Sequence, residues 1–358
     1  MRFVFKTDYR QDIGLFRHNG DRFWYGLLVL LVAAAPLLLD RFYLGELTYV
    51  FVLAVAGIGI MLLTGYTGLV SLGHAAFLGI GAYAHGYFLQ QGVPFVLSVP
   101  LATLLTTAAG LLVALPALRM TGIYLAIATL LFAVIIEQVF IRWESVTHGF
   151  RGFSVGVPQV FGLPLTDPVL FYYICFAVLA LAMLAAINLL RSPTGRAFVA
   201  IRDSEIAAQS MGVHLARYKA TAFAISAGFT GLAGCLFAHK IGYLAPDAFG
   251  IILSIQLLLM AVIGGLGSLH GVVFGALFVG ALPQVIAVLR DYLPDRIAQQ
   301  PGLEPGVFGL ILVAIILFEP QGIYGRWRKV KLYFQLFPMY KAATFKRQKT
   351  YTRSERNK

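Results

Sequence analysis

Charged residues are scarce in this sequence, and their scarcity excludes a soluble globular protein. Asp, Glu, Lys and Arg together make up 12% of the 358 residues, whereas a soluble domain carries about 25% charged residues. Hydrophobic residues reach 59%, and the mean hydropathy is +0.80. A chain of this composition is predicted to cross a membrane several times.

Reactive groups are also few. The only two cysteines, Cys175 and Cys235, each lie inside an apolar run, which favours buried thiols over a disulfide or a metal site. The histidines are scattered, so the sequence predicts neither metal ligands nor catalytic residues. A membrane enzyme would need a polar constellation within the spans, and none is found. Because no GxxxxGK[ST] phosphate loop occurs, this chain is not expected to hydrolyse ATP.

Apolar runs of about 20 residues, the length that spans a hydrocarbon core of about 30 Å, recur along the chain. We predict an all-α polytopic membrane protein with ten transmembrane helices, some of them short. The runs cover residues 23–39, 48–64, 72–89, 95–115, 122–140, 168–190, 217–239, 250–263, 270–289 and 306–318. The second and third runs are compatible either with two spans or with one broken hairpin.

The basic residues predict the orientation of these spans. The net charge of +12 would suggest nucleic acid in a soluble protein, but here the Lys and Arg residues lie mostly between apolar runs, so no nucleic-acid partner is expected. If both termini are cytoplasmic, 22 of the 28 basic residues fall on the cytoplasmic side, in accord with the positive-inside rule. An even number of spans, such as ten, satisfies this arrangement.

This orientation divides the chain into three parts. Residues 1–22 form a cytoplasmic segment that lacks the apolar core and cleavage site of a signal peptide. Residues 23–319 form the transmembrane domain. Residues 320–358 form a basic cytoplasmic tail, which is expected to lie against anionic membrane lipid or, alternatively, to contact a specific protein.

Few polar residues fall within the predicted spans. Ser71 and His74 stand in the glycine-rich stretch 65–85, where irregular backbone is tolerated only if it is buried in protein or lines a water-filled cavity. Both are candidates for the translocation pathway, although a histidine that starts a helix is often only a structural hydrogen-bonding group. Glu137, near the outer end of the fifth run, either faces a vestibule or reaches the headgroups.

Glycine patterns indicate close helix packing and a weak internal repeat. Gly271 and Gly275 show the small-xxx-small spacing that lets helix backbones approach in lipid. The stretch GGLGSLHGVVFG at 264–275 also echoes the stretch that contains Ser71 and His74. This likeness hints at a duplication.

The central polar segment at 191–217 is predicted to be a cytoplasmic loop that carries a short helix. Ser204 is suited to cap a helix that starts at Glu205, and Gly212 is suited to end it in a left-handed conformation. A helix of two turns is unstable alone. A partner surface is therefore expected to complete it.

Several motifs carry a family resemblance. Glu205, Ala207, Ala208 and Gly212 resemble the EAA-type coupling loop of ABC importer permeases, with one residue more than the usual spacing. The stretches GYTGLVSLGHAAFLGIGAYA, ALRMTGIYLAIATL, AIRDSEIAAQSMGVHLARYKATAFAISA and LLLMAVIGGLGSLHGVVFGAL are similar, in collinear order, to the LivM-type permeases of the branched-chain amino acid ABC importer family. The resemblance covers roughly residues 52–322.

The resemblance implies an ABC importer permease fold in the bacterial inner membrane, and a set of partners. These partners are a LivH-like permease, two LivG/LivF-like ATPases that use ATP and Mg, and a periplasmic or extracellular substrate-binding protein. Branched-chain amino acids are the implied substrates, and the family also handles urea, amides and aromatic acids. By carry-over, the residues of the ATPase-coupling loop are Arg202, Asp203, Glu205, Ala207, Ala208 and Gly212.

Two further points stay open in the sequence. Relatives often read TGGxxG in an outer loop where this chain reads THGFRG, which makes Thr147, His148 and Arg151 candidates for contact with an external partner, against a plain solvated connector. An ion-coupled secondary transporter remains the alternative function. In that case the central segment would be only a cytoplasmic loop that connects two spans.

Overall fold

The computed structural model describes residues 19–156, 159–160, 163–164, 167–290, 303–318 and 321–336. Residues 1–18 of the predicted cytoplasmic segment and residues 337–358 of the basic tail lie outside the described residues. The chain divides into two compact units, a larger one, Ala33–Tyr324, and a smaller one made of Met1–Val32 and Gly325–Lys358. All sites discussed below belong to the larger unit.

Each of the ten predicted runs lies on a helix, because long apolar runs without polar breaks satisfy their backbone hydrogen bonds only within themselves in lipid. The helices are α2 (Asn19–Leu38), α3 (Arg41–Ile60), α4 (His74–Gln90), α5 (Phe95–Ala117), α6 (Ile123–Arg142), α8 (Pro168–Arg191), α11 (Leu215–Ile241), α12 (Ile251–Gly264), α13 (Leu269–Arg290) and α15 (Leu303–Phe318). Within the described residues, seven helical segments are long and apolar enough to cross a membrane. The polytopic class is therefore confirmed.

The second and third runs are separate helices. Helix α3 widens at its end into a π-helical segment, η1 (Met61–Tyr66), and an irregular turn follows before α4 starts at His74. Two threonine hydroxyls fix this turn: Thr67 Oγ1 donates to the Leu62 carbonyl at 2.9 Å, and Thr64 Oγ1 donates to the Leu69 carbonyl at 3.2 Å. Thr64, Thr67, Leu69 and Ser71 of this stretch are buried, while Gly68 and Val70 are exposed.

Helices α3 and α11 form the centre of the larger unit. In the most apolar stretch of each helix, 89% of the residues are buried for α3 with η1 and 72% for α11. The buried share is only 22% for α5 and 28% for both α6 and α8. Glycines bring the helices into backbone contact: a Cβ on Gly81 of α4 would lie 2.3 Å from the Gly231 carbonyl oxygen of α11. The predicted close packing at Gly271 and Gly275 is present as well, between α13 and the backbone of α12.

A Gly81→Ala substitution is expected to lower the stability of the fold. The added methyl would meet the Gly231 backbone, so α4 and α11 must separate, at a cost of about 1–3 kcal/mol for an overpacked site. Thermal unfolding of the protein in detergent measures this loss. The matched control is Gly309→Ala in α15, where a Cβ meets nothing within 4 Å and the midpoint should not fall.

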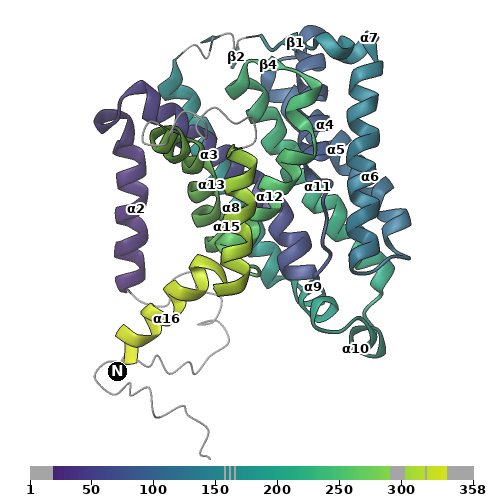
Figure 1. Ribbon diagram of the computed structural model, residues 1–358, viewed down its shortest axis with the longest axis vertical. Helices are drawn as coiled ribbons and strands as arrows, with labels where there is room; N and C mark the ends of the chain where they lie inside the picture. The colour runs from purple at the N-terminus through teal and green to yellow at the C-terminus, as the bar shows by residue number, and fades with distance from the viewer. Residues whose placement is uncertain are drawn as a thin grey trace, which may run out of the picture. The chain divides into compact units, whose positions relative to one another are not determined.

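The two ends of the larger unit carry different short elements, as Figure 1 shows. At one end lie α9 (Pro193–Asp203) and α10 (Glu205–Ser210), which join α8 to α11. At the other end lie α7 (Glu144–Thr147), η2 (Gly149–Arg151), β1 (Phe153–Ser154), β4 (Tyr243–Leu244) and η3 (Pro246–Phe249). The central polar segment and the predicted outer loop are therefore at opposite ends.

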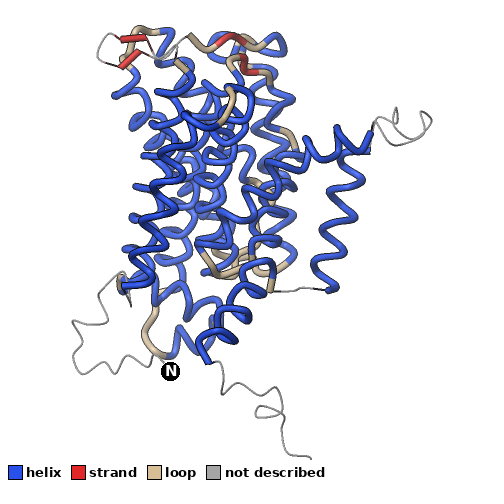
Figure 2. Tube along the Cα trace, turned by 90° about the vertical axis from the view of Figure 1, so that its left-hand side faces the viewer, coloured by secondary structure: helices blue, strands red, loops and turns tan. Residues whose placement is uncertain are grey.

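Among the residues that the structure describes, the all-α expectation holds apart from four two-residue strands, drawn red in Figure 2. Strand β1 pairs with β4 in antiparallel register, with Phe153 opposite Leu244. Strand β2 (Gln159–Val160) pairs with β3 (Leu163–Pro164) in the same way. The described part of the basic tail is a helix, α16 (Gly322–Leu336).

Candidate functional site

The predicted loop at 191–217 contains two capped helices. Ser192 accepts a hydrogen bond from the Gly195 amide at the start of α9, and Ser204 accepts one from the Ala207 amide at 3.2 Å at the start of α10. Gly212 follows α10 with φ of +84°, and the Val213 amide donates to the Ala208 carbonyl at 3.0 Å. The helix predicted from Glu205 is therefore present, with the cap and the stop that its sequence indicates.

Helix α9 fastens this segment to the transmembrane core. Its Phe198 is fully buried and belongs to a core cluster with Leu63, Leu125 and Phe223 of the surrounding helices. Its Ile201 is buried as well. The segment is consequently part of the packed body of the protein.

An ion pair ties α10 to α11. Lys219 Nζ lies 2.8 Å from Glu205 Oε2, and the Lys219 side chain is only 3% exposed. A lysine this deeply buried needs an ionic partner, because an unpaired charge out of water is very costly. Glu205 therefore anchors α10 from within, 14 residues away from its partner in sequence.

Two large apolar side chains are exposed on α10 and at the residue that follows it. Ile206 is 84% exposed and Met211 is 85% exposed, while Ala207 is exposed and Ala208 is buried against the protein. Exposed apolar side chains are ordinary on lipid-facing helices, but this segment is flanked by Arg202, Asp203 and Arg217 and stands apart from the apolar spans. The sequence analysis did not mark Ile206 and Met211 as contact residues, since a pattern of two turns does not indicate which face the fold leaves open.

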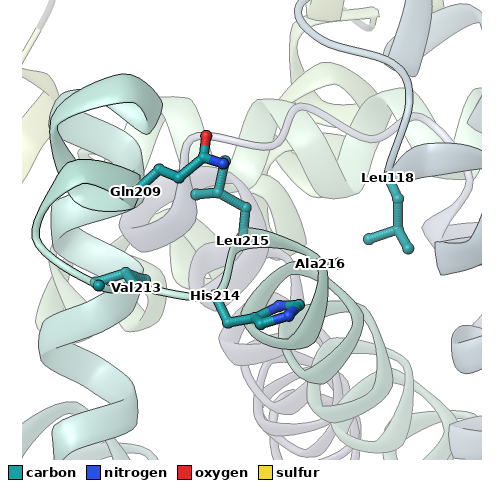
Figure 3. Close-up of a pocket in the computed structure, with 7 residues that line it drawn as sticks. Leu118, Gln209, Val213, His214, Leu215 and Ala216 are labelled. Atoms are coloured by element: carbon teal, nitrogen blue, oxygen red, sulfur yellow. The ribbon is translucent and has the colours of Figure 1, made fainter.

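A cleft of about 440 Å³ opens beside α10, as shown in Figure 3. Gln209 lines it from α10, and the turn into α11 lines it with Val213, His214 and Leu215. Leu118, from the turn between α5 and α6, lies on its other side. The segment therefore offers a protruding apolar face and an adjacent hollow at the same end of the protein.

Of the predicted pathway residues, Ser71 and His74 lie together just before and at the start of α4, whereas Glu137 lies on α6. Ser71 and His74 are both buried, and His74 Nε2 lies 2.8 Å from Ser226 Oγ, which in turn donates to the Gly59 carbonyl at 2.7 Å. His74 thus joins α4, α11 and α3. Glu137 is half-buried on α6, and its carboxylate approaches Gly250 at the start of α12.

The predicted docking residues of the outer loop lie close to one another in a folded turn. Thr147 is buried, and its hydroxyl hydrogen bonds to the Phe140 carbonyl at 2.6 Å. His148 adopts a left-handed φ of +57° and is exposed, as is Arg151. The Arg151 carbonyl accepts a hydrogen bond from the Tyr243 hydroxyl, so this turn is held to the β1–β4 pair.

The described residues include no group of three or more His, Cys, Asp or Glu side chains placed to hold a metal ion. Both cysteines are buried free thiols.

Comparisons with known proteins place the chain in a family. Residues 42–317 match the family described as "Branched-chain amino acid transport system / permease component". The chain is 32% identical over 321 residues to the high-affinity branched-chain amino acid transport system permease protein LivM of Escherichia coli K12, covering 83% of this chain and 73% of that protein. LivM of Salmonella typhimurium matches to the same extent. No solved structure matches the chain.

A second group of relatives has a different named cargo. The autoinducer 2 import system permease protein LsrC of Escherichia coli O9:H4 is 27% identical over 315 residues, which cover 82% of this chain and 85% of that protein. The buried glycine contacts, the capped α10 helix and these matches define a polytopic transport permease. The chain belongs to the branched-chain amino acid permease family of ABC importers and is a multi-pass protein of the inner membrane, a transporter subunit and not an enzyme.

Proposed function

We propose that this chain forms half of the translocation pathway of an ATP-driven importer and that α10 is the element through which the ATPase acts. The observation that supports this role is the outward face of α10, where Ile206 and Met211 are 84% and 85% exposed on a polar segment. Exposed apolar side chains in such a setting favour a protein partner, because removing them from water in an interface lowers the free energy. Family membership supplies the kind of partner.

The proposed complex contains four kinds of protein. A LivH-like permease completes the pathway, and two LivG/LivF-like ATPases bind ATP and Mg at the end that carries α9 and α10. A periplasmic or extracellular binding protein delivers substrate to the opposite end, against the turn that holds Thr147, His148 and Arg151. Since the two surfaces lie at opposite ends of the larger unit, the geometry accommodates both partners at once.

The proposed topology has ten spans with both termini in the cytoplasm. Each predicted run coincides with a helix, and α10 shares its end with the basic residues of the central segment. The positive-inside rule places such a segment in the cytoplasm. Ser71, His74 and Glu137 are proposed to act in the pathway during transport, when the helices that enclose them move apart.

The proposed substrates are branched-chain amino acids or related small polar and amphipathic solutes, among them urea, amides and aromatic acids. The names of the LivM relatives mention branched-chain amino acids, and the name of LsrC mentions autoinducer 2. Selection among these substrates is assigned to the delivering protein.

Purification of the tagged protein from its own membrane in mild detergent tests this proposal. We expect a second permease and two ATPase chains to co-purify, and a binding protein to join when its ligand is present. Recovery of the chain alone, or as a homodimer without ATPases, would contradict the assignment.

A further inference from the structure

Arg202, the penultimate residue of α9, makes contacts that point inward. Its Nε and Nη2 donate to Asp203 Oδ1 at 3.1 and 2.9 Å, while its Nη1 donates to the Gly65 carbonyl oxygen at 3.3 Å. The Asp203 contact holds the guanidinium by two donors, which fixes its orientation. A third donor, on Nη1, reaches a carbonyl 137 residues away in sequence.

Gly65 belongs to one of two glycine turns that meet at this point. The first comprises the last turn of η1, which contains Gly65, and the residues just after it, which include Gly68. The second contains Gly265 and Gly267 and joins α12 to α13. A Cβ on Gly65 would lie 2.7 Å from the Gly267 amide nitrogen, so the turns touch each other.

The Arg202 side chain packs against both turns. A Cβ on Gly68 would lie 3.2 Å from Arg202 Cγ, and a Cβ on Gly267 would lie 3.3 Å from Arg202 Nη1. Gly68 and Gly267 have φ of +76° and +82°, a conformation that glycine adopts without strain. The absence of side chains at these positions makes room for the arginine.

We infer that Arg202 is a positioning residue that transmits movement of the α9–α10 segment to the two glycine turns, and through them to α3, α12 and α13. This inference rests on the proposed function. It assigns Arg202 to contact with the glycine turns inside the permease, in place of direct contact with the ATPase. A hydrogen bond from a charged donor, supported by close packing, passes displacement from one element to another, because packed interfaces shift between discrete arrangements.

An Arg202→Gln variant of the assembled complex tests this role. Glutamine cannot both pair with Asp203 and reach Gly65, so we expect uptake to fall about 10-fold or more, the scale of one lost hydrogen bond to a charged group. ATPase co-purification and the thermal midpoint should stay close to wild type. The ATP hydrolysed per solute transported should therefore rise by a similar factor.

Two further variants sharpen the test. Arg196→Gln removes the same charge from an exposed position of the same helix, where the guanidinium contacts only the nearby Arg191 carbonyl among the described contacts, and should leave the coupling ratio unchanged. Asp203→Asn weakens the clamp on Arg202 and should raise the ratio in the same direction as Arg202→Gln.

The outcomes separate this inference from the proposed function. A normal coupling ratio in Arg202→Gln would overturn the inward role. Loss of ATPase binding in a stable Arg202→Gln protein would also overturn it, by making Arg202 a docking residue. If the wild-type protein binds no ATPase, the proposed function itself fails, whatever the Arg202 variants do.

Discussion

A Glu205→Lys substitution is expected to abolish ATP-driven uptake while the protein still inserts in the membrane. Glu205 pairs with Lys219, whose side chain is 3% exposed. The substitution leaves Lys219 without its partner and adds a second positive charge beside it. Because the Glu205 side chain is 34% exposed, the cost falls below the value of about 3–5 kcal/mol for a fully buried pair, and it acts to displace α10 from α11. Uptake into membrane vesicles, normalised to the inserted protein, measures the effect.

The charge-swapped double variant, Glu205→Lys with Lys219→Glu, is the matched control. It restores an ion pair of opposite polarity at the same place, so it should recover part of the uptake that the single variant loses. Normal uptake by Glu205→Lys would refute the anchoring role. A double variant as inactive as the single one would instead indicate that the Glu205 carboxylate is needed by the partner directly.

An Ile206→Asp substitution is expected to remove the ATPases from the purified complex without unfolding the permease. Ile206 is 84% exposed, so its replacement leaves no cavity. In the complex, however, it would place a carboxylate in an apolar contact, and a central interface residue of this kind carries about 2 kcal/mol or more, a loss of at least roughly 30-fold in affinity. Quantitative co-purification and uptake report this loss.

Ile206→Val keeps the apolar surface and should retain both ATPase binding and uptake. Met211→Asp, at the equally exposed neighbouring position, should act in the same direction as Ile206→Asp. Full ATPase binding by Ile206→Asp would show that the partner does not contact this face of α10.

Local chemistry made part of this site predictable from the sequence. Ser204 and Gly212 mark the ends of α10 because capping and left-handed termination depend on residues only a few positions apart. The membrane helices were predictable for a similar reason, since span length and hydropathy are properties of single segments. Helix boundaries differ by a few residues, as at α11, which begins at Leu215 rather than 217.

Contacts between distant segments were beyond such patterns. From the sequence, Lys219 is interpreted as a charge at the edge of the polar segment. In the fold, its side chain is buried and pairs with Glu205. The link from Arg202 to Gly65 and the pairing of β1 with β4 join residues about 90 or more positions apart, and no local periodicity encodes them. The π-helical end of α3 also escapes a pattern based on 3.6 residues per turn.

Transport by the reconstituted complex tests the central claim most directly. Proteoliposomes that hold the wild-type complex and enclose Mg and ATP should take up substrate from its binding protein, and uptake should persist when ionophores collapse all ion gradients. Removal of the enclosed ATP should stop it. Uptake that continues without ATP but ceases when the ion gradients are collapsed would contradict the account and identify an ion-coupled transporter instead.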